Sequence, residues 1–202
     1  MERFDQILNV PDELDLYLTA SKLKPATTFV VPPWYFREKG DDEINKFKAS
    51  LSGYSLFWQE LEEKNGLVNA GHRLFNVGAS SQNLDRLVNA FKFRHIGGVK
   101  FFTELGLALG YPADAVEAFP GKEAWSFKNS LRKAAEARVA LPLYLAYLTH
   151  IPAKIDLLNG GISSSSQEQA MQYQKHVTEH NPMLAQAVKT EFEHRFNVSF
   201  WE

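Results

Sequence analysis

The sequence predicts a predominantly helical α+β fold with one small β-hairpin or sheet element. Apolar residues recur at helical spacing along most of the chain, and one glycine- and asparagine-rich segment interrupts that pattern. The hydrophobic content of 45% is typical of a globular protein. Because a chain of 202 residues buries about 70% of its unfolded surface, we expect a single domain over residues 1–202 that needs neither disulfides nor a structural metal.

The N-terminal region, about residues 1–65, is expected to be mainly helical. A cap at residue 9 or 10, Pro11 in the first turn and two carboxylates predict a first helix that ends near Lys22. Residues 27–31 are β-branched or aromatic and precede two prolines, which cannot donate hydrogen bonds to a neighbouring strand. They therefore predict a short edge strand.

The β element is expected between Gly66 and Ser80. Apolar pairs alternate there with asparagine and glycine, which is typical of short strands joined by a tight turn. Before this segment, residues 41–61 have apolar side chains at helical spacing, with a break at Ser52 and Gly53. The sequence therefore predicts a hairpin that follows a second helical region.

Helical patterns occupy most of the chain after the β element. Serine, glycine or proline bounds most of these patterns, as expected for caps and breaks. The predicted helices cover about residues 81–91, 99–109, 112–119, 125–139, 167–180 and 184–196. The apolar run over 139–151 is predicted to be buried, and the glycine- and serine-rich run over 160–166 is predicted to be a loop.

The composition excludes several classes of function. The chain has no cysteine, so zinc fingers, iron–sulfur clusters and cysteine nucleophiles are excluded, and a reducing, cytoplasmic compartment is expected. The acidic first residues do not match a signal peptide, and the longest nearly uncharged run is too short to span a membrane. A net charge of −2 gives no general attraction for nucleic acid or anionic lipid. We therefore expect no cofactor, no nucleic acid and no membrane, but a small-molecule ligand or a protein partner.

His176, Glu179 and His180 match the pattern H-x-x-E-H, in which two histidines bind zinc and the glutamate activates a water. Zinc also needs a third protein ligand, which the acidic residues or the histidine within 191–194 would have to provide. The alternative is a solvated helix face on which the two histidines have this spacing by chance. A zinc hydrolase is therefore one of the functions to be tested.

Two further groups of residues are candidates for binding. Arg94 and His95 precede a glycine pair and a predicted helix, so cationic side chains and backbone N–H groups could surround an anion there. An ordinary turn with solvated cations explains the same residues. Basic residues also alternate with aromatic ones between Lys122 and Arg138, either as a surface for a partner or as the solvated side of a core-facing helix. A non-catalytic interaction protein could use this basic face or the aromatic residues Trp34, Tyr35 and Trp201.

Two segments resemble the motifs of a known family. Residues 109–119 read Leu-Gly-Tyr-Pro-Ala-Asp-Ala-Val-Glu-Ala-Phe, and residues 150–157 read His-Ile-Pro-Ala-Lys-Ile-Asp-Leu. They are similar to the motifs LGYPxCCVxxF and HIPCxxxC of a family of small, functionally uncharacterised prokaryotic proteins, and the resemblance extends over about residues 66–190. Every cysteine of the family is replaced here, by Asp114, Ala115, Ala153 and Leu157.

The resemblance implies that Tyr111, Phe119 and His150 lie together, around a pocket in which Asp114 has taken the place of a thiol. An aspartate and a histidine within hydrogen-bond reach supply general acid–base chemistry of the isomerase, lyase or hydrolase kind. The first hypothesis is therefore a small-molecule-binding protein or metal-independent enzyme. Its catalytic pair would be Asp114 and His150, its ligand-binding residues would include Tyr111 and Phe119, and the loop over 160–166 would close the pocket.

Overall fold

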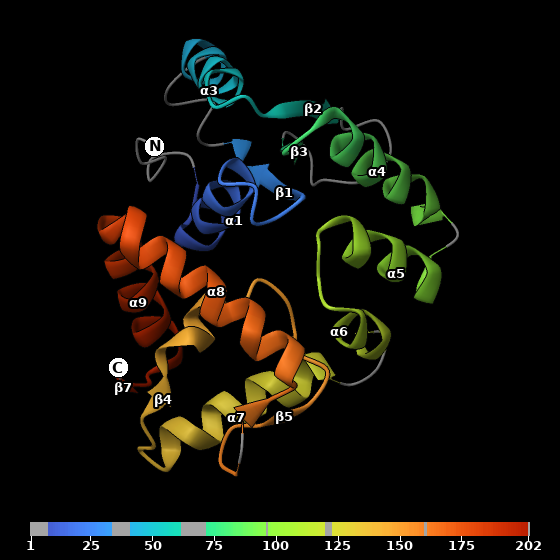
Figure 1. The fold of residues 1–202 in the computed structure, drawn as a ribbon. Coiled ribbons are helices and arrows are strands. Elements are labelled where there is room, and N and C mark those ends of the chain that lie inside the picture. Colours follow the sequence, from blue (N-terminus) through green and yellow to red (C-terminus); the bar gives the residue numbers. More distant parts are fainter. Residues whose placement is uncertain are drawn as a thin grey trace. The chain divides into compact units, whose positions relative to one another are not determined.

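A computed structural model describes residues 8–33, 41–61, 72–95, 97–119, 123–159 and 161–201 (Figure 1). It confirms a predominantly helical α+β fold in which the described strands form sheets of only two or three members. Packing groups the residues into two compact units. Unit 1 comprises Met1–His95 and Ala108–Gly110, and unit 2 comprises Ile96–Leu107 and Tyr111–Glu202. The chain first passes from unit 1 to unit 2 after residue 95, and the expectation of a single domain stays a prediction.

Unit 1 begins with helix α1 (Val10–Ala20), which confirms the first predicted helix. Asn9 caps it, because its side chain accepts a hydrogen bond from the backbone N–H of Asp12 at 2.9 Å. After the helix, Lys22 adopts a left-handed conformation with φ of 61°, and the chain turns toward strand β1 (Ala26–Val31). The predicted edge strand over 27–31 is thus confirmed.

Strand β3 (Arg73–Gly78) lies at the centre of a three-stranded antiparallel sheet with the order β1-β3-β2. Its second neighbour is β2 (Phe57–Leu61), a segment that the helical spacing assigned to a helix, so that prediction was wrong. The reason is non-local: β3 is buried and needs hydrogen-bond partners along both edges, which local spacing does not reveal. The strand expected around residues 67–68 lies outside the described residues.

Besides α1, two further helices among the described residues of unit 1 accompany this sheet. They are α3 (Asp41–Gly53) and α4 (Ser81–Lys92), and a short 3₁₀ turn, η2 (Phe93–His95), follows α4. Ser80 caps α4 by accepting from the N–H of Asn83 at 3.2 Å. The core contains a cluster of three aromatic rings, whose centroids are 5.6–5.8 Å apart. These rings belong to Phe29, Phe47 and Phe75.

Unit 1 also contains a buried charged cluster that the sequence did not indicate. The side chain of Lys24 has no exposed surface, and its Nζ lies 2.8 Å from Oδ1 of Asp15. Burial, reinforced by the charge of Asp15, raises the pKa of the nearby Asp12 to about 6. Near this cluster in the chain, Pro25 packs against Gly110, where an added Cβ would lie only 2.4 Å from Cδ of the proline.

Unit 2 consists of helices and very short strands. Its helices are α5 (Gly98–Ala108), α6 (Ala113–Ala118), α7 (Glu123–Glu136), α8 (Ser164–His180) and α9 (Pro182–Phe196), with the 3₁₀ helix η3 (Leu143–Tyr147). Strands β4 (Leu141–Pro142) and β7 (Phe200–Trp201) pair in parallel, and β5 (Ile155–Asp156) and β6 (Gly161–Ile162) pair antiparallel. Helix α8 packs on η3 and on α9. Among the described residues, no helix is long and apolar enough to cross a membrane.

The segment before α8 differs from its prediction. Residues 160–166 were expected to form a loop, with a helix that begins near Gln167. Instead, Gly161 and Ile162 form a strand, Ser163 is the N-cap of α8, and the helix begins at Ser164. Gly160 lies outside the described residues. Because the serines belong to a strand–helix junction, this segment is not a loop that closes over a pocket.

Candidate functional site

The candidate site lies within unit 2, where three segments meet. Helix α6 carries Asp114 in its first turn, the beginning of α8 carries a run of serines, and His150 follows η3. Gly106 of α5 allows a close approach of α6, because an added Cβ would lie 2.8 Å from Cγ2 of Val116. This packing fixes the helix that presents Asp114.

A chain of hydrogen bonds connects the two predicted catalytic residues. The Ser165 hydroxyl donates to Oδ1 of Asp114 at 2.7 Å, and the Ser163 hydroxyl donates to Oγ of Ser166 at 3.0 Å. Oγ of Ser166 and Nε2 of His150 share a hydrogen bond of 2.9 Å. Ser163 also hydrogen-bonds to Asp114, which joins the two halves, and its Oγ lies 3.5 Å from Oγ of Ser165. We call these five side chains the serine relay.

The serines of the relay do not act as ordinary helix caps. Ser163 occupies the N-cap of α8, but its hydroxyl accepts no hydrogen bond from a backbone N–H of the first turn. An N-cap serine normally accepts such a bond, which stabilises the helix by about 1 kcal/mol. Here that hydroxyl bonds to Ser166 instead. The side chains at this helix end are therefore organised toward one another and not toward the backbone.

The carboxylate of Asp114 is ionised at neutral pH. Its partial burial alone would raise its pKa. Hydrogen bonds from Ser165 and Ser163, together with backbone N–H groups, outweigh that effect and hold the pKa below its usual range. The negative charge also lies at the start of α8, where the helix dipole favours an anion. Asp114 is thus a permanent proton-accepting end for the relay.

The other end of the relay is buried. His150 is only 9% exposed and Ser166 is not exposed at all. The ring of Tyr111 lies beside the imidazole, with ring centroids 5.3 Å apart and planes inclined by 34°. The predicted proximity of Tyr111 and His150 is therefore confirmed. Because Ser166 is inaccessible, it can conduct a proton but cannot attack a substrate as a nucleophile.

The remaining predicted ligand-binding residues are Phe119, Arg94 and His95. Phe119 is 36% exposed at the end of α6, and its ring contacts Phe102 of α5 at a centroid distance of 5.1 Å. Arg94 belongs to η2 in unit 1, and the side chain of His95 lies outside the described part of the chain. The ligand-binding role of these three residues stays a prediction.

The zinc alternative gains no support from the geometry. His176 and His180 stack on each other in α8, with ring centroids 4.4 Å apart, and Nδ1 of His180 lies within hydrogen-bond distance of the carbonyl of His176 at 3.0 Å. Over the described ranges, no three or more His, Asp or Glu side chains form a group that could hold a metal ion. Burial, followed by the charge of His180, lowers the pKa of His176.

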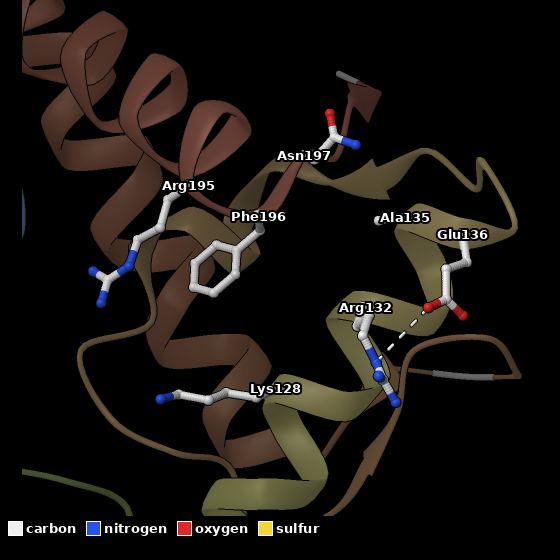
Figure 2. A pocket seen from close by; sticks show the side chains of 7 residues that line it. All are labelled: Lys128, Arg132, Ala135, Glu136, Arg195, Phe196 and Asn197. Carbon is white, nitrogen blue, oxygen red and sulfur yellow. Dashed lines mark ion pairs between the residues drawn. The ribbon is translucent and has the colours of Figure 1, made fainter.

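The basic face of α7 is partly described. Lys122 and the side chain of Trp125 lie outside the described residues, as do Trp34 and Tyr35, whereas Trp201 is 56% exposed. Lys128 and Arg132 of α7 line a pocket together with residues from the end of α9 (Figure 2). A protein partner for this face stays a prediction.

Sequence reasoning missed the serines as site residues. The run over 163–166 was interpreted as loop composition, although four hydroxyls before a polar helix are a usable signal for side-chain hydrogen bonding. Arg195, which lines the α7 pocket, has no comparable signal in the sequence, because only the packing of α9 against α7 brings it there.

Comparison of the chain with protein-family models, curated proteins and solved structures gives no match. The resemblance to the cysteine-containing prokaryotic family therefore stays a prediction, and the serine relay must be interpreted from its own geometry.

Proposed function

We propose that this chain binds a small molecule beside Tyr111 and Asp114, and that the serine relay moves protons between this ligand and His150. One observation carries the proposal, namely the hydrogen-bonded path that runs from the partly exposed carboxylate of Asp114 through Ser163 and Ser166 to the buried imidazole of His150. Histidine is the side chain that most readily gains and loses a proton near neutral pH. Along such a path, a bound molecule can exchange a proton with the buried imidazole of His150.

The relay supports two orders of its protons. In the first, Ser163 donates to Ser166, and Ser166 donates to Nε2 of His150. In the second, Nε2–H of His150 donates to Ser166, Ser166 donates to Ser163, and Ser163 donates to Asp114. The contribution of Ser163 to the pKa of Asp114 supports the second order. A proton that Asp114 takes from the ligand passes to Ser163, while Ser163 passes its own proton to Ser166 and Ser166 passes its own to Nε2 of His150. The first order then becomes the second, Asp114 is ionised again, and no heavy atom moves.

The chemistry that fits this arrangement is proton transfer of the isomerase or lyase kind. A general base must lie within hydrogen-bond reach of the proton it removes, and Asp114 is the relay member whose carboxylate is both ionised and partly exposed. A hydrolase with a serine nucleophile fits less well, because the serine that bonds to the imidazole is fully buried. The proposal therefore has two parts: the general one is that the chain binds a small molecule, and the specific one is that it catalyses proton transfer on that molecule.

Mass spectrometry of small molecules retained by the native protein tests the binding part. We expect the wild-type protein and the Ser164→Ala variant to retain the same compound, because Ser164 is exposed and is not a member of the relay. Asp114→Asn should reduce the retained amount at least about tenfold, as the loss of one charge-assisted hydrogen bond predicts. Equal retention by Asp114→Asn, or no retained compound in the wild-type protein, would contradict the proposal.

An NMR titration of the His150 imidazole tests the relay itself. If the path is continuous, Asp114→Asn should lower the midpoint of that titration, because the carboxylate favours a protonated imidazole at the other end. Ser166→Ala should interrupt the path and make the midpoint insensitive to Asp114→Asn. Ser164→Ala is again the control. A His150 midpoint that is the same in the wild-type protein and in Asp114→Asn would show that no coupling exists.

A further inference from the structure

A cavity at the surface of unit 2 shares no lining residue with the serine relay. It has a volume of about 530 Å³ and is formed where the end of α7 meets the end of α9 (Figure 2). Pockets that bind small organic molecules typically have volumes of about 300–1,000 Å³. The side chains that give this cavity its character are Lys128, Arg132, Glu136, Arg195, Phe196 and Asn197.

The charges of the cavity are unbalanced. Three cationic side chains face one carboxylate, that of Glu136, and Nε of Arg132 lies 3.8 Å from its Oε1. Both side chains of this ion pair are mostly exposed, so the pair contributes little to the stability of the fold. No carboxylate elsewhere in the described part of the chain pairs with Lys128 or Arg195. The cavity therefore has two positive charges that no described carboxylate pairs with.

An aromatic ring lies in the middle of these charges. In Figure 2 the ring of Phe196 has Arg195 and Lys128 on one side and the pair of Arg132 and Glu136 on the other. The guanidinium of Arg195 lies over this ring, 5.5 Å from its centroid, in a cation–π contact that limits its motion. A flat apolar surface with cations beside it suits a ligand that combines a planar ring with an anionic group.

The helix dipole explains only some of these cations. Arg195 lies in the last turn of α9, where a positive charge is favoured by the carbonyl end of the helix. Lys128 lies in the middle of α7, so the dipole gives no reason for a cation there. Asn197 ends α9 in a left-handed conformation with φ of 52°, and its amide adds a hydrogen-bond donor and an acceptor to the cavity.

We infer that this cavity binds a small organic oxyanion attached to a planar ring, of the kind found in nucleoside monophosphates and aryl phosphates. The oxyanion would be bound by Lys128 and Arg195, which lie on the same side of the Phe196 ring, because a guanidinium binds phosphate through paired hydrogen bonds and an ammonium adds a second positive charge. The ring would pack on Phe196. This inference is independent of the serine relay, since the two sites share no residue.

Titration calorimetry with adenosine 5′-monophosphate at low ionic strength tests the inference on the full chain. Adenosine, which lacks the charge, and inorganic phosphate, which lacks the ring, should each bind at least about tenfold more weakly than the monophosphate. Lys128→Gln and Arg195→Gln should each weaken binding about fivefold or more. Phe196→Leu should weaken the binding of the monophosphate but leave the binding of inorganic phosphate unchanged. This result would separate the contribution of the ring contact from that of the charges.

Lys133→Gln is the matched control, because Lys133 is an exposed cation of the same helix that does not line the cavity. It should leave the affinity unchanged. An equal loss in Lys133→Gln and Lys128→Gln would overturn the inference, because it would indicate general electrostatic attraction. Absence of binding of adenosine 5′-monophosphate, or tighter binding of a polyglutamate peptide, would also overturn it, the latter in favour of an acidic protein partner.

Discussion

The two units bury polar side chains in opposite ways. In unit 1 a fully buried ammonium pairs with a carboxylate, since Lys24 lies 2.8 Å from Asp15. In unit 2 the buried members of the serine relay are the hydroxyl of Ser166 and the imidazole of His150, and the carboxylate stands at a partly exposed end. A buried charge that loses its partner costs about 3–5 kcal/mol, whereas a buried hydroxyl or imidazole that loses one hydrogen bond costs about 1–3 kcal/mol.

The difference indicates two kinds of polar cluster. The ion pair of unit 1 holds one arrangement, because any change of partner or charge carries a large penalty. The hydroxyls of unit 2 can each donate in either direction, so the relay tolerates more than one arrangement of its protons. We therefore assign stability to the first cluster and proton movement to the second, and three measurements test that assignment.

The largest effect is expected from Lys24→Met. This change leaves Asp15 and Asp12 without their cation, so the free energy of unfolding should fall by about 3–5 kcal/mol in urea denaturation. Lys92→Met is the control, because Lys92 is exposed at the end of α4 and bonds only to Asn89 among the described partners. That change should cost less than about 0.5 kcal/mol. A loss in Lys24→Met as small as in the control would remove the contrast between the units.

A smaller effect is expected from Ser166→Ala. The substitution removes one hydrogen bond of a buried imidazole, so we expect a loss of about 1–3 kcal/mol in the same measurement. Ser164→Ala, in the same turn of α8 but exposed, should change the free energy of unfolding by no more than about 0.5 kcal/mol. If the free energy of unfolding fell by more than about 3 kcal/mol, the relay would stabilise the fold as strongly as the ion pair does, and the contrast between the two clusters would not hold.

The smallest effect concerns the dependence of stability on pH. Because burial raises the pKa of Asp12 to about 6 from 3.8, the folded state binds its proton more tightly than the unfolded state does. The resulting stability is complete below about pH 3.8 and is lost as the pH rises through about 6. Asp12→Asn should remove this loss and raise the stability at pH 7 by roughly 1–2 kcal/mol after allowance for solvent screening.

Asp114 should show the opposite sign. Its pKa is lowered in the folded state, so its contribution is present above the ordinary aspartate pKa and is lost as the pH falls through the folded value. Asp114→Asn should therefore make stability depend less on pH at the acid end of the profile. Asp12→Asn should do so between about pH 4 and pH 6. Two variants that change the same part of the profile would contradict the different environments of the two carboxylates.

Features determined by neighbouring residues could be predicted from the sequence. The caps at Asn9 and Ser80 set helix starts through short-range geometry, and both lie where the sequence indicates. Strand β2 could not be predicted in this way, because its partner β3 is supplied by a later part of the chain. Its apolar side chains fit helical spacing as well as strand spacing.

The candidate site shows the same division. Asp114 and His150 could be singled out from their motifs, but the serines that connect them could not. Asp114 and Ser165 are 51 positions apart in the sequence, and only tertiary packing of α6 against the start of α8 joins them. The α7 cavity depends in the same way on the packing of α9, so its third cation, Arg195, could not be assigned in advance.

The contact between Gly110 and Pro25 affects how the protein can be synthesised. The chain passes between the units after residues 95, 107 and 110, so unit 1 is not a continuous segment. Protein chains emerge from the ribosome with the N-terminus first. Unit 1 therefore stays incomplete until residue 110 has emerged, by which time all of α5 has already been made. A nascent chain or a proteolytic fragment that ends at residue 95 lacks Gly110, against which Pro25 packs.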